Sequence, residues 1–284
     1  MSRNQARAIP VLMYHHVSTS PGMITVTPGN FAAQMAYLAS AGYRTIGSTE
    51  LAAFLSGEDM PAKSIVITFD DGYLDNWVHA HPVLQRHGLT AMCFLVSSWP
   101  GEGGVRPNVS NANSALPALL DHHAGERAIE NGRVDDVILR WSEIEAMREA
   151  GTFEFHSHTH THVRWDQVTG SRGEKRERLH ADLSAARAAL RTRLGDVSDH
   201  LCWPQGYYDD DYREVALNAG FRHFHTCHSG TNVGVNPLDR NGSADGERTI
   251  KRLEVRDRPA SWLASRLWVH TRPAISRAYL TIKR

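Results

Sequence analysis

The chain repeatedly shows an amphipathic segment, then a glycine, then a short apolar run. Thr27-Pro28 predicts the start of the first such helix, with proline in the first turn. The apolar face of this helix is expected to consist of Phe31, Met35 and Leu38. Gly42 then ends the helix before an expected strand at 43–46.

The same order of helix, glycine and strand recurs around three further glycines: Gly88, Gly151 and Gly220. Ser142-x-x-Glu145 has the pattern of a capping box and predicts a helix that runs to Ala150. Another helix is expected from Tyr212. Helices and strands that alternate at this length predict an α/β fold with a parallel sheet.

One apolar run ends in two neighbouring carboxylates. Ile65-Val66-Ile67 leads into Thr68-Phe69-Asp70-Asp71-Gly72, and α/β folds build their sites at this edge of a parallel sheet. Successive residues of a strand point to opposite sides, so Asp70 and Asp71 can have different functions. One could bind a divalent cation while the other, kept ionised by that cation, accepts a proton. The alternative is an ordinary turn.

A second segment is rich in imidazoles, with histidine at every other position: His156, His158, His160 and His162. Catalytic zinc usually has three protein ligands and one open position. Either His158 with His162 or His156 with His160 could complete such a set with one aspartate, and the residues alone leave the register open. The alternative is a solvated, histidine-rich loop.

The order of three motifs resembles a known enzyme family. Thr68-Phe69-Asp70-Asp71-Gly72, His158-Thr159-x-x-His162 and Trp203-Pro204-Gln205-Gly206-Tyr207 are similar to those of the polysaccharide deacetylases with NodB homology, carbohydrate esterase family 4. The resemblance runs from about Ile9 to about Val255. It implies a distorted, incomplete (β/α) barrel.

The resemblance also implies a function for each residue. Asp70 would be the general base, and Asp71, His158 and His162 would bind the metal, usually Zn²⁺, which settles the register. The substrate would be an N-acetylhexosamine in a polysaccharide, an oligosaccharide or a lipid-linked glycan, and the products would be acetate and a free amine. The third motif would supply three residues that contact the substrate: Trp203, Pro204 and Tyr207.

The third motif departs from the family pattern in two ways. The arginine that commonly precedes the proline and orients the base is missing, since Cys202 and Trp203 stand before Pro204. The sequence does not identify another partner for Asp70. Gln205 replaces the tyrosine whose backbone N–H contacts the oxyanion, and glutamine can supply that N–H equally well.

The late Leu-x-His motif, which usually provides the general acid, is not recognisable after Gly220. The chain instead begins with Val11-Leu12-Met13-Tyr14-His15-His16-Val17. This resembles the circularly permuted branch of the family, in which the first strand carries the catalytic histidine. His15 is therefore the candidate acid. The alternatives are that His15 merely ends a strand or that His16 has this function.

Composition indicates an ordinary enzyme. The 284 residues include 31 basic and 31 acidic side chains, so no overall field favours nucleic acid. Three cysteines, Cys93, Cys202 and Cys227, argue against a disulfide framework and are compatible with a reducing compartment. The first residues show no apolar signal region. A cytoplasmic location, possible also at the inner face of the membrane, is expected.

Two segments differ from the expected catalytic domain, which comprises residues 1–255. Residues 99–137 contain many Gly and Asn and are expected to be a long insertion that either controls substrate access or is inert. Residues 232–247 are also expected to be loose. The tail, 256–284, has seven basic residues and one acidic residue. It could contact an anionic membrane surface or form a terminal helix packed on the barrel.

Two other functions remain open at this stage. The same metal and base could hydrolyse a non-sugar amide or imide. A non-catalytic glycan-binding relative is the third possibility, although a binding module has no need of a base beside a metal.

Overall fold

The computed structural model describes residues 4–111, 114–234 and 248–283, so most of the segment 232–247 lies outside the described residues. A nine-stranded sheet with parallel pairing forms its centre. The strands are β1 (Val11–Tyr14), β4 (Arg44–Thr45), β5 (Ser64–Asp71), β6 (Ala91–Leu95), β7 (Phe153–Ser157), β8 (His200–Cys202), β9 (His223–His225), β10 (Arg248–Ile250) and β11 (Leu253–Glu254). The main path has the order β10-β9-β8-β7-β6-β5-β1-β11, with β4 paired to β5.

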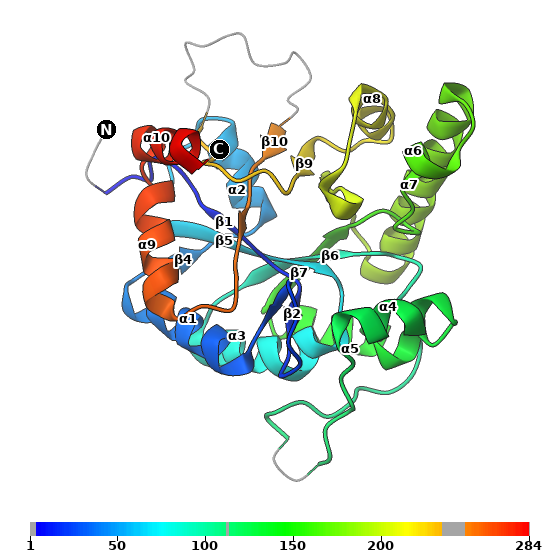
Figure 1. Cartoon of the computed structure of the whole chain (residues 1–284), viewed down its shortest axis with the longest axis horizontal. Helices are drawn as coiled ribbons and strands as arrows, with labels where there is room; N and C mark the ends of the chain where they lie inside the picture. Colours follow the sequence, from blue (N-terminus) through cyan, green and yellow to red (C-terminus); the bar gives the residue numbers. More distant parts are fainter. Residues whose placement is uncertain (1–3, 112–113, 235–247, 284) are drawn as a thin grey trace.

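The sheet curls into an incomplete barrel (Figure 1). Its two free edges are β10 and β11, which follow each other in the sequence, so Lys251 and Arg252 connect the two edges. The predicted α/β class and the distorted, incomplete (β/α) barrel are confirmed.

Helices surround the sheet on its outer face (Figure 1). They are α1 (Pro28–Ser40), α2 (Ser48–Leu55), α3 (His81–His87), α5 (Trp141–Glu149), α7 (Arg172–Leu194), α8 (Asp210–Asn218) and α9 (Ala260–His270). Smaller elements are β2 (His16–Val17), β3 (Thr25–Val26), a π-helical turn at Asn76–Ala80, α4 (His122–Glu130), α6 (Trp165–Val168), 3-10 turns at Val134–Asp136 and Pro204–Gly206, and α10 (Pro273–Lys283).

The side chains of β5 alternate between two apolar clusters. Ile65, Ile67 and Phe69 pack in the larger core with residues of α1, α3, α5 and α9. Val66 packs instead in a second cluster with residues of β6, β10 and α2. Because side chains alternate, Asp70 lies on the same face as Val66 and is directed to the interior of the barrel.

The first predicted helix is confirmed, since α1 begins at Pro28 and buries all three residues of its expected apolar face: Phe31, Met35 and Leu38. The predicted capping box is wrong by two residues. α5 begins at Trp141, and the Glu143 carboxylate accepts the Arg140 backbone N–H at 2.9 Å. Ser142 therefore lies inside the helix. Glu143 also accepts two hydrogen bonds from the Arg106 guanidinium at 2.7 Å, which fixes the start of the helix.

The helix expected from Tyr212 begins two residues earlier, as α8. Asp209 caps it by accepting the Tyr212 backbone N–H at 2.9 Å. Tyr212 is thus in the first turn rather than at the start.

The segment 99–137 is partly helical and is attached to the domain. It contains α4, and Ala128 and Val137 pack with Tyr73 and Ile138 in a small apolar cluster. The Arg106–Glu143 ion pair, whose carboxylate is fully buried, fixes its other part to α5.

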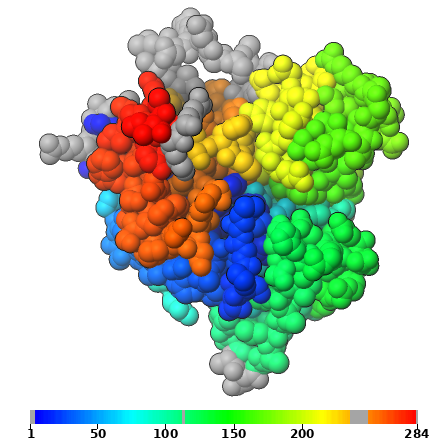
Figure 2. Space-filling view, in the orientation of Figure 1, coloured from blue at the N-terminus to red at the C-terminus, as the bar shows by residue number. Residues whose placement is uncertain are grey.

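The C-terminal segment forms α9 and α10. α9 contacts α1 and buries Leu263 and Leu267 in the larger core. Within the described ranges, no helix is both long enough and apolar enough to cross a membrane. Figure 2 shows the orange and red C-terminal segments at the left of the upper part of the molecule and the yellow segment around α8 at the right.

Candidate active site

Two neighbouring aspartates end β5 at the carboxyl edge of the sheet. Both Asp70 and Asp71 are buried. Asp71 has a left-handed backbone with φ of 72°, and Gly72 follows with φ of 80°. A Cβ at Gly72 would lie 2.6 Å from Leu95 Cδ2, so the turn requires glycine at this position. This turn separates the directions of the two carboxylates.

Two imidazoles reach Asp71 from the segment after β7. His158 Nδ1 lies 2.8 Å from the Cys202 carbonyl oxygen, so this nitrogen donates and Nε2 is directed to Asp71. The Nε2 atoms of His158 and His162 lie 3.3 Å and 3.5 Å from Asp71 Oδ1. The structure thus brings together the three residues that the sequence indicated as metal ligands.

The separations among these three residues fit a metal ion. With ligand bonds of about 2.0–2.2 Å, a tetrahedral zinc ion holds two ligand atoms about 3.4 Å apart. Among the described residues, Asp71 Oδ1 is also a buried oxygen without a hydrogen-bond donor. Burial alone would raise the pKa of Asp71, but the two imidazoles hold it well below its usual range. Burial lowers the pKa of His162 to about 4, so both groups are in the form that binds metals.

A second ligand set overlaps the first and shares His158. Asp70, His158 and Cys202 also place potential ligand atoms within 4.8 Å of one another. However, the Arg252 guanidinium occupies this space, with Nη2 3.0 Å from Cys202 Sγ. Burial raises the pKa of the Cys202 thiol to about 11, so it is protonated at neutral pH. The positive charge and the protonated thiol favour the set with Asp71.

Arg252 is the partner of Asp70 that the sequence did not identify. Its two terminal nitrogens donate to the two Asp70 oxygens at 2.7 Å and 2.8 Å, and both side chains are buried. Arg252 Nε donates to the Thr226 carbonyl oxygen at 2.9 Å, which fixes the plane of the guanidinium. Burial raises the pKa of Asp70, but Arg252 outweighs it, so the pKa is below its usual value and the carboxylate stays ionised.

His15, at the end of β1, faces this carboxylate. His15 Nε2 lies 3.7 Å from Asp70 Oδ2, and the His15 carbonyl oxygen accepts the Asn76 side-chain amide at 2.8 Å. His16 has a different partner, since its Nδ1 lies 2.6 Å from Asp75 Oδ2. Burial lowers the pKa of His15, so its ring is neutral in the resting protein. The geometry therefore places His15, and not His16, beside Asp70.

The third motif forms a tight turn after β8. Gln205 has φ of 54°, and its side chain is exposed. Two of the side chains expected to contact the substrate are not exposed in this structure. Trp203 is fully buried against Tyr212 and Phe224, and Pro204 is buried as well.

Tyr207, the third of these expected contacts, is partly exposed. The Arg164 guanidinium lies 3.7 Å from the centre of its ring. Tyr207 thus keeps an accessible surface near the motif, with one face covered by Arg164.

Sequence reasoning also missed Asp182 in α7. This buried carboxylate accepts the backbone N–H groups of His160 and Thr161 at 3.1 Å each and the Thr161 hydroxyl at 2.6 Å. It therefore fixes the loop between the two imidazoles. An available signal was its place between Leu179 and Leu183 on the buried face of an otherwise polar helix.

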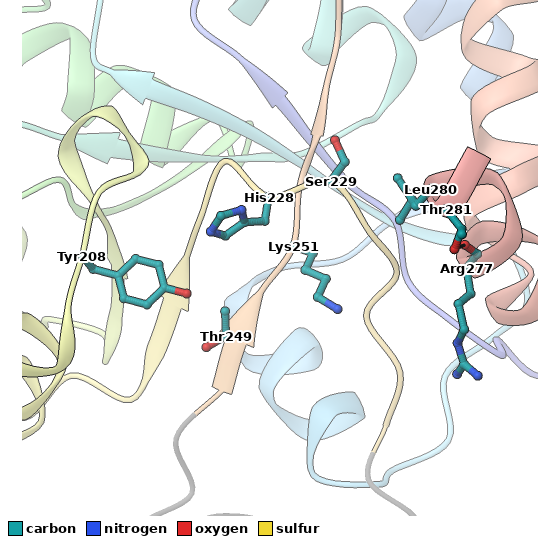
Figure 3. A pocket seen from close by; sticks show the side chains of 8 residues that line it. All are labelled: Tyr208, His228, Ser229, Thr249, Lys251, Arg277, Leu280 and Thr281. Atoms are coloured by element: carbon teal, nitrogen blue, oxygen red, sulfur yellow. Dashed lines mark hydrogen bonds between the residues drawn. The ribbon is translucent and has the colours of Figure 1, made fainter. Parts of the chain in front are cut away.

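The structure has a cavity of about 730 Å³, and two of its lining residues, Tyr208 and Lys251, are sequence neighbours of Tyr207 and Arg252. Figure 3 shows its lining, which comes from the turn after β8, the segment after β9, β10 with the residue that follows it, and α10. The residues are Tyr208, His228, Ser229, Thr249, Lys251, Arg277, Leu280 and Thr281. Lys251 directly precedes Arg252, and Tyr208 follows Tyr207. The cavity combines hydroxyl groups, cations and one aromatic ring.

Comparisons with known proteins agree with this fold. The solved structure of IcaB from Ammonifex degensii has a TM-score of 0.69 at 23% identity and covers 93% of this chain and 97% of its own. The structure titled "Streptococcus pyogenes deacetylase PplD in complex with acetate" has a TM-score of 0.68 at 18% identity and covers 94% and 100%.

At the sequence level, the poly-beta-1,6-N-acetyl-D-glucosamine N-deacetylase of Escherichia coli K12 is 26% identical over 221 residues, which are 69% of this chain and 30% of that protein. The chain spans about a third of the length of the curated relatives it matches. The family model for polysaccharide deacetylase matches residues 57–224, more than half of the sequence. The chain therefore belongs to the polysaccharide deacetylase family, which has NodB homology and is carbohydrate esterase family 4.

Proposed function

We propose that the protein is a metal-dependent N-deacetylase. It hydrolyses the N-acetyl group of an N-acetylhexosamine in a polysaccharide, oligosaccharide or lipid-linked glycan and releases acetate. One observation carries the proposal: Asp71, His158 and His162 converge at the spacing of metal ligands, while Asp70 is held separately by Arg252 and faces His15.

Asp71, His158 and His162 would hold the cation, preferably Zn²⁺. When bound, such a cation polarises a carbonyl group and lowers the pKa of water. Asp70 accepts a proton from the attacking water. The Gln205 backbone N–H is assigned to the developing oxyanion.

His15 is assigned to protonate the departing amine. Because burial lowers its pKa, the proton that it donates has to arrive during the reaction. Asp70 holds the water proton at that stage, and its Oδ2 lies 3.7 Å from His15 Nε2. Arg252 lowers the pKa of Asp70, which favours release of this proton. Water and the amide are thereby converted into acetate and the free amine without any other reactant.

The relatives and the cavity support a glycan substrate. The Escherichia coli relative is named for deacetylation of a β-1,6-linked N-acetylglucosamine polymer. The cavity lined by Tyr208 and Lys251 offers hydroxyl groups and the Tyr208 ring, which suit a sugar with polar edges and an apolar face. We assign a contact with the substrate to Tyr207, which is partly exposed and follows Gly206 of the third motif.

We also propose that the enzyme works in the cytoplasm, with peripheral membrane contact through the C-terminal segment. Trp268 and Ile282 are 52% and 86% exposed, in a segment with a basic excess. Trp268→Ser with Ile282→Ser keeps the buried face of α9 and should reduce co-sedimentation with anionic vesicles. Equal pelleting of this variant and the original protein would remove the membrane assignment.

The experiment for the main proposal measures acetate released from β-1,6-linked N-acetylglucosamine oligomers and from chitooligosaccharides. Asp70→Asn should lose nearly all turnover but retain the metal, whereas His158→Ala should lose both. Arg133→Gln, which removes an exposed ion pair, is the control and should behave as the original protein. Full activity of Asp70→Asn would refute the assigned mechanism. Activity on simple amides or imides alone would favour the non-sugar hydrolase, and binding without turnover would favour the non-catalytic relative.

A further inference from the structure

A second cluster of histidines lies within the sheet and has no part in the reaction above. Its four histidines are 3%, 1%, 7% and 0% exposed: His156, His200, His223 and His225. His200 begins β8 and His223 begins β9, and the two are paired in register, so they point to the same side of the sheet. Asp199 directly precedes β8. The cluster thus has carboxylate and imidazole side chains, which can bind metals, at the amino ends of β8 and β9. This is the edge of the sheet opposite the carboxyl edge that carries Asp71.

Several ring nitrogens of this cluster lack a hydrogen-bond partner in the described part of the chain. They are His156 Nε2, His200 Nε2 and His225 Nδ1. Buried polar atoms are nearly always satisfied, and an unsatisfied atom calls for a specific explanation such as an ion. His200 Nδ1 lies 2.9 Å from His225 Nε2. In the tautomer in which His200 donates this bond, its Nε2 carries a free lone pair, as in metal sites whose histidines are oriented by a second hydrogen bond.

We infer that Asp199, His200 and His223 form a second divalent metal site. Their potential ligand atoms all lie within 4.8 Å of one another. Asp199 Oδ1 lies 3.0 Å from His223 Nδ1, a hydrogen bond that a bound ion would replace, and 4.0 Å from His200 Nε2. These separations bracket the distance of about 3.4 Å between two ligands of a tetrahedral zinc ion. Two imidazoles and a carboxylate suit zinc and the divalent metals that resemble it.

Binding requires a small rearrangement. The rings of His200 and His223 are stacked, with centroids 4.4 Å apart and planes at 12°, so one ring must turn to direct its lone pair at a shared ion. The Asp199 side chain is 42% exposed, which gives an ion access from solvent. A bound ion would join the first residues of β8 and β9.

The test uses the full chain and zinc alone. Protein freed of metal by a chelator is reloaded with Zn²⁺, passed through a desalting column and measured for zinc per chain. We expect two zinc ions for the original protein, one for Asp199→Asn and one for Asp71→Asn. Asp196→Asn, an exposed aspartate three residues away, is the matched control and should retain two. His223→Gln is a second variant, and near-ultraviolet circular dichroism checks its folding.

The outcomes separate this inference from the proposed function. Equal zinc in Asp199→Asn and the original protein would overturn the second site and leave the cluster as a stack of neutral imidazoles. A single zinc that is lost in Asp199→Asn but kept in Asp71→Asn would support the second site and contradict the catalytic metal. Loading with Co²⁺ gives an independent readout, since each site should contribute a visible absorption band that its own variant removes.

Discussion

Replacement of Arg252 by methionine tests the arrangement of the base most sharply. The guanidinium makes two hydrogen bonds to Asp70 at 2.7 Å and 2.8 Å, and the two side chains are 0% and 3% exposed. Methionine retains most of the volume but leaves a buried carboxylate without a counter-charge. Breaking a buried pair in this way costs about 3–5 kcal/mol of unfolding free energy. Urea unfolding followed by tryptophan fluorescence measures this loss.

A double-mutant cycle shows whether the loss comes from this pair. In Arg252→Met with Asp70→Asn, neither charge remains buried, so the double variant should be more stable than the sum of the two single losses predicts. Arg133→Met is the matched control, because its ion pair with Asp136 is exposed and should contribute little. A loss in Arg252→Met as small as that in the control, or strictly additive losses, would refute the assignment of Arg252 as the partner of Asp70.

The pH dependence has a definite sign. In the original protein the pKa of Asp70 is below its usual 3.8, so the pair stabilises the fold above that value and loses this contribution as the pH falls through the lower, folded pKa. In Arg252→Met burial instead raises the pKa of Asp70. The stability difference between the two proteins should therefore be largest near neutral pH and shrink in acid, and the acid limb of the activity profile of the variant should move to higher pH.

Three further predictions concern the metal ligands and the acid. Asp182→Ala frees the loop between the imidazoles and should weaken zinc affinity about 10–100-fold, as loss of supporting hydrogen bonds does elsewhere; unchanged affinity in a zinc titration would contradict the positioning role. Burial disfavours the charged form of His158, but its contacts with Cys202 and Asp71 raise its pKa well above the usual value. Zinc affinity should therefore fall as the pH is lowered through that raised pKa, and a flat pH profile by calorimetry would count against this ligand. His15→Gln should lower kcat about 10²–10⁴-fold with zinc content unchanged, whereas a matching loss in His16→Gln alone would transfer the acid function to that residue.

The two local motifs could be predicted because each depends on residues close together in the sequence. An apolar strand that ends in Asp70-Asp71 has to deliver both carboxylates to the sheet edge, and the glycines after the helices marked the order of elements. Arg252 and Asp70 are 182 positions apart in the sequence, and no local sequence pattern predicts that two such distant residues pair. One signal was available: Arg252 stands two residues after Ile250, which packs inside the barrel, so an extended chain directs both side chains to the same side.

The errors also have physical reasons. Trp203 stands in a site motif, but three-dimensional packing against Tyr212 and Phe224 decided its burial. The start of α5 was misplaced because the long-range ion pair with Arg106 selected Glu143 rather than Glu145. The cluster at Asp199, His200 and His223 was invisible in the sequence, since it forms only where two separate strands pair.

Anomalous scattering from a crystal loaded with zinc is the most direct test of the catalytic centre. We expect a peak about 2.0–2.2 Å from one Asp71 oxygen and from Nε2 of His158 and His162, with Asp70 still paired to Arg252. A peak between Asp70, His158 and Cys202 with Arg252 displaced, or no peak at Asp71, would contradict it.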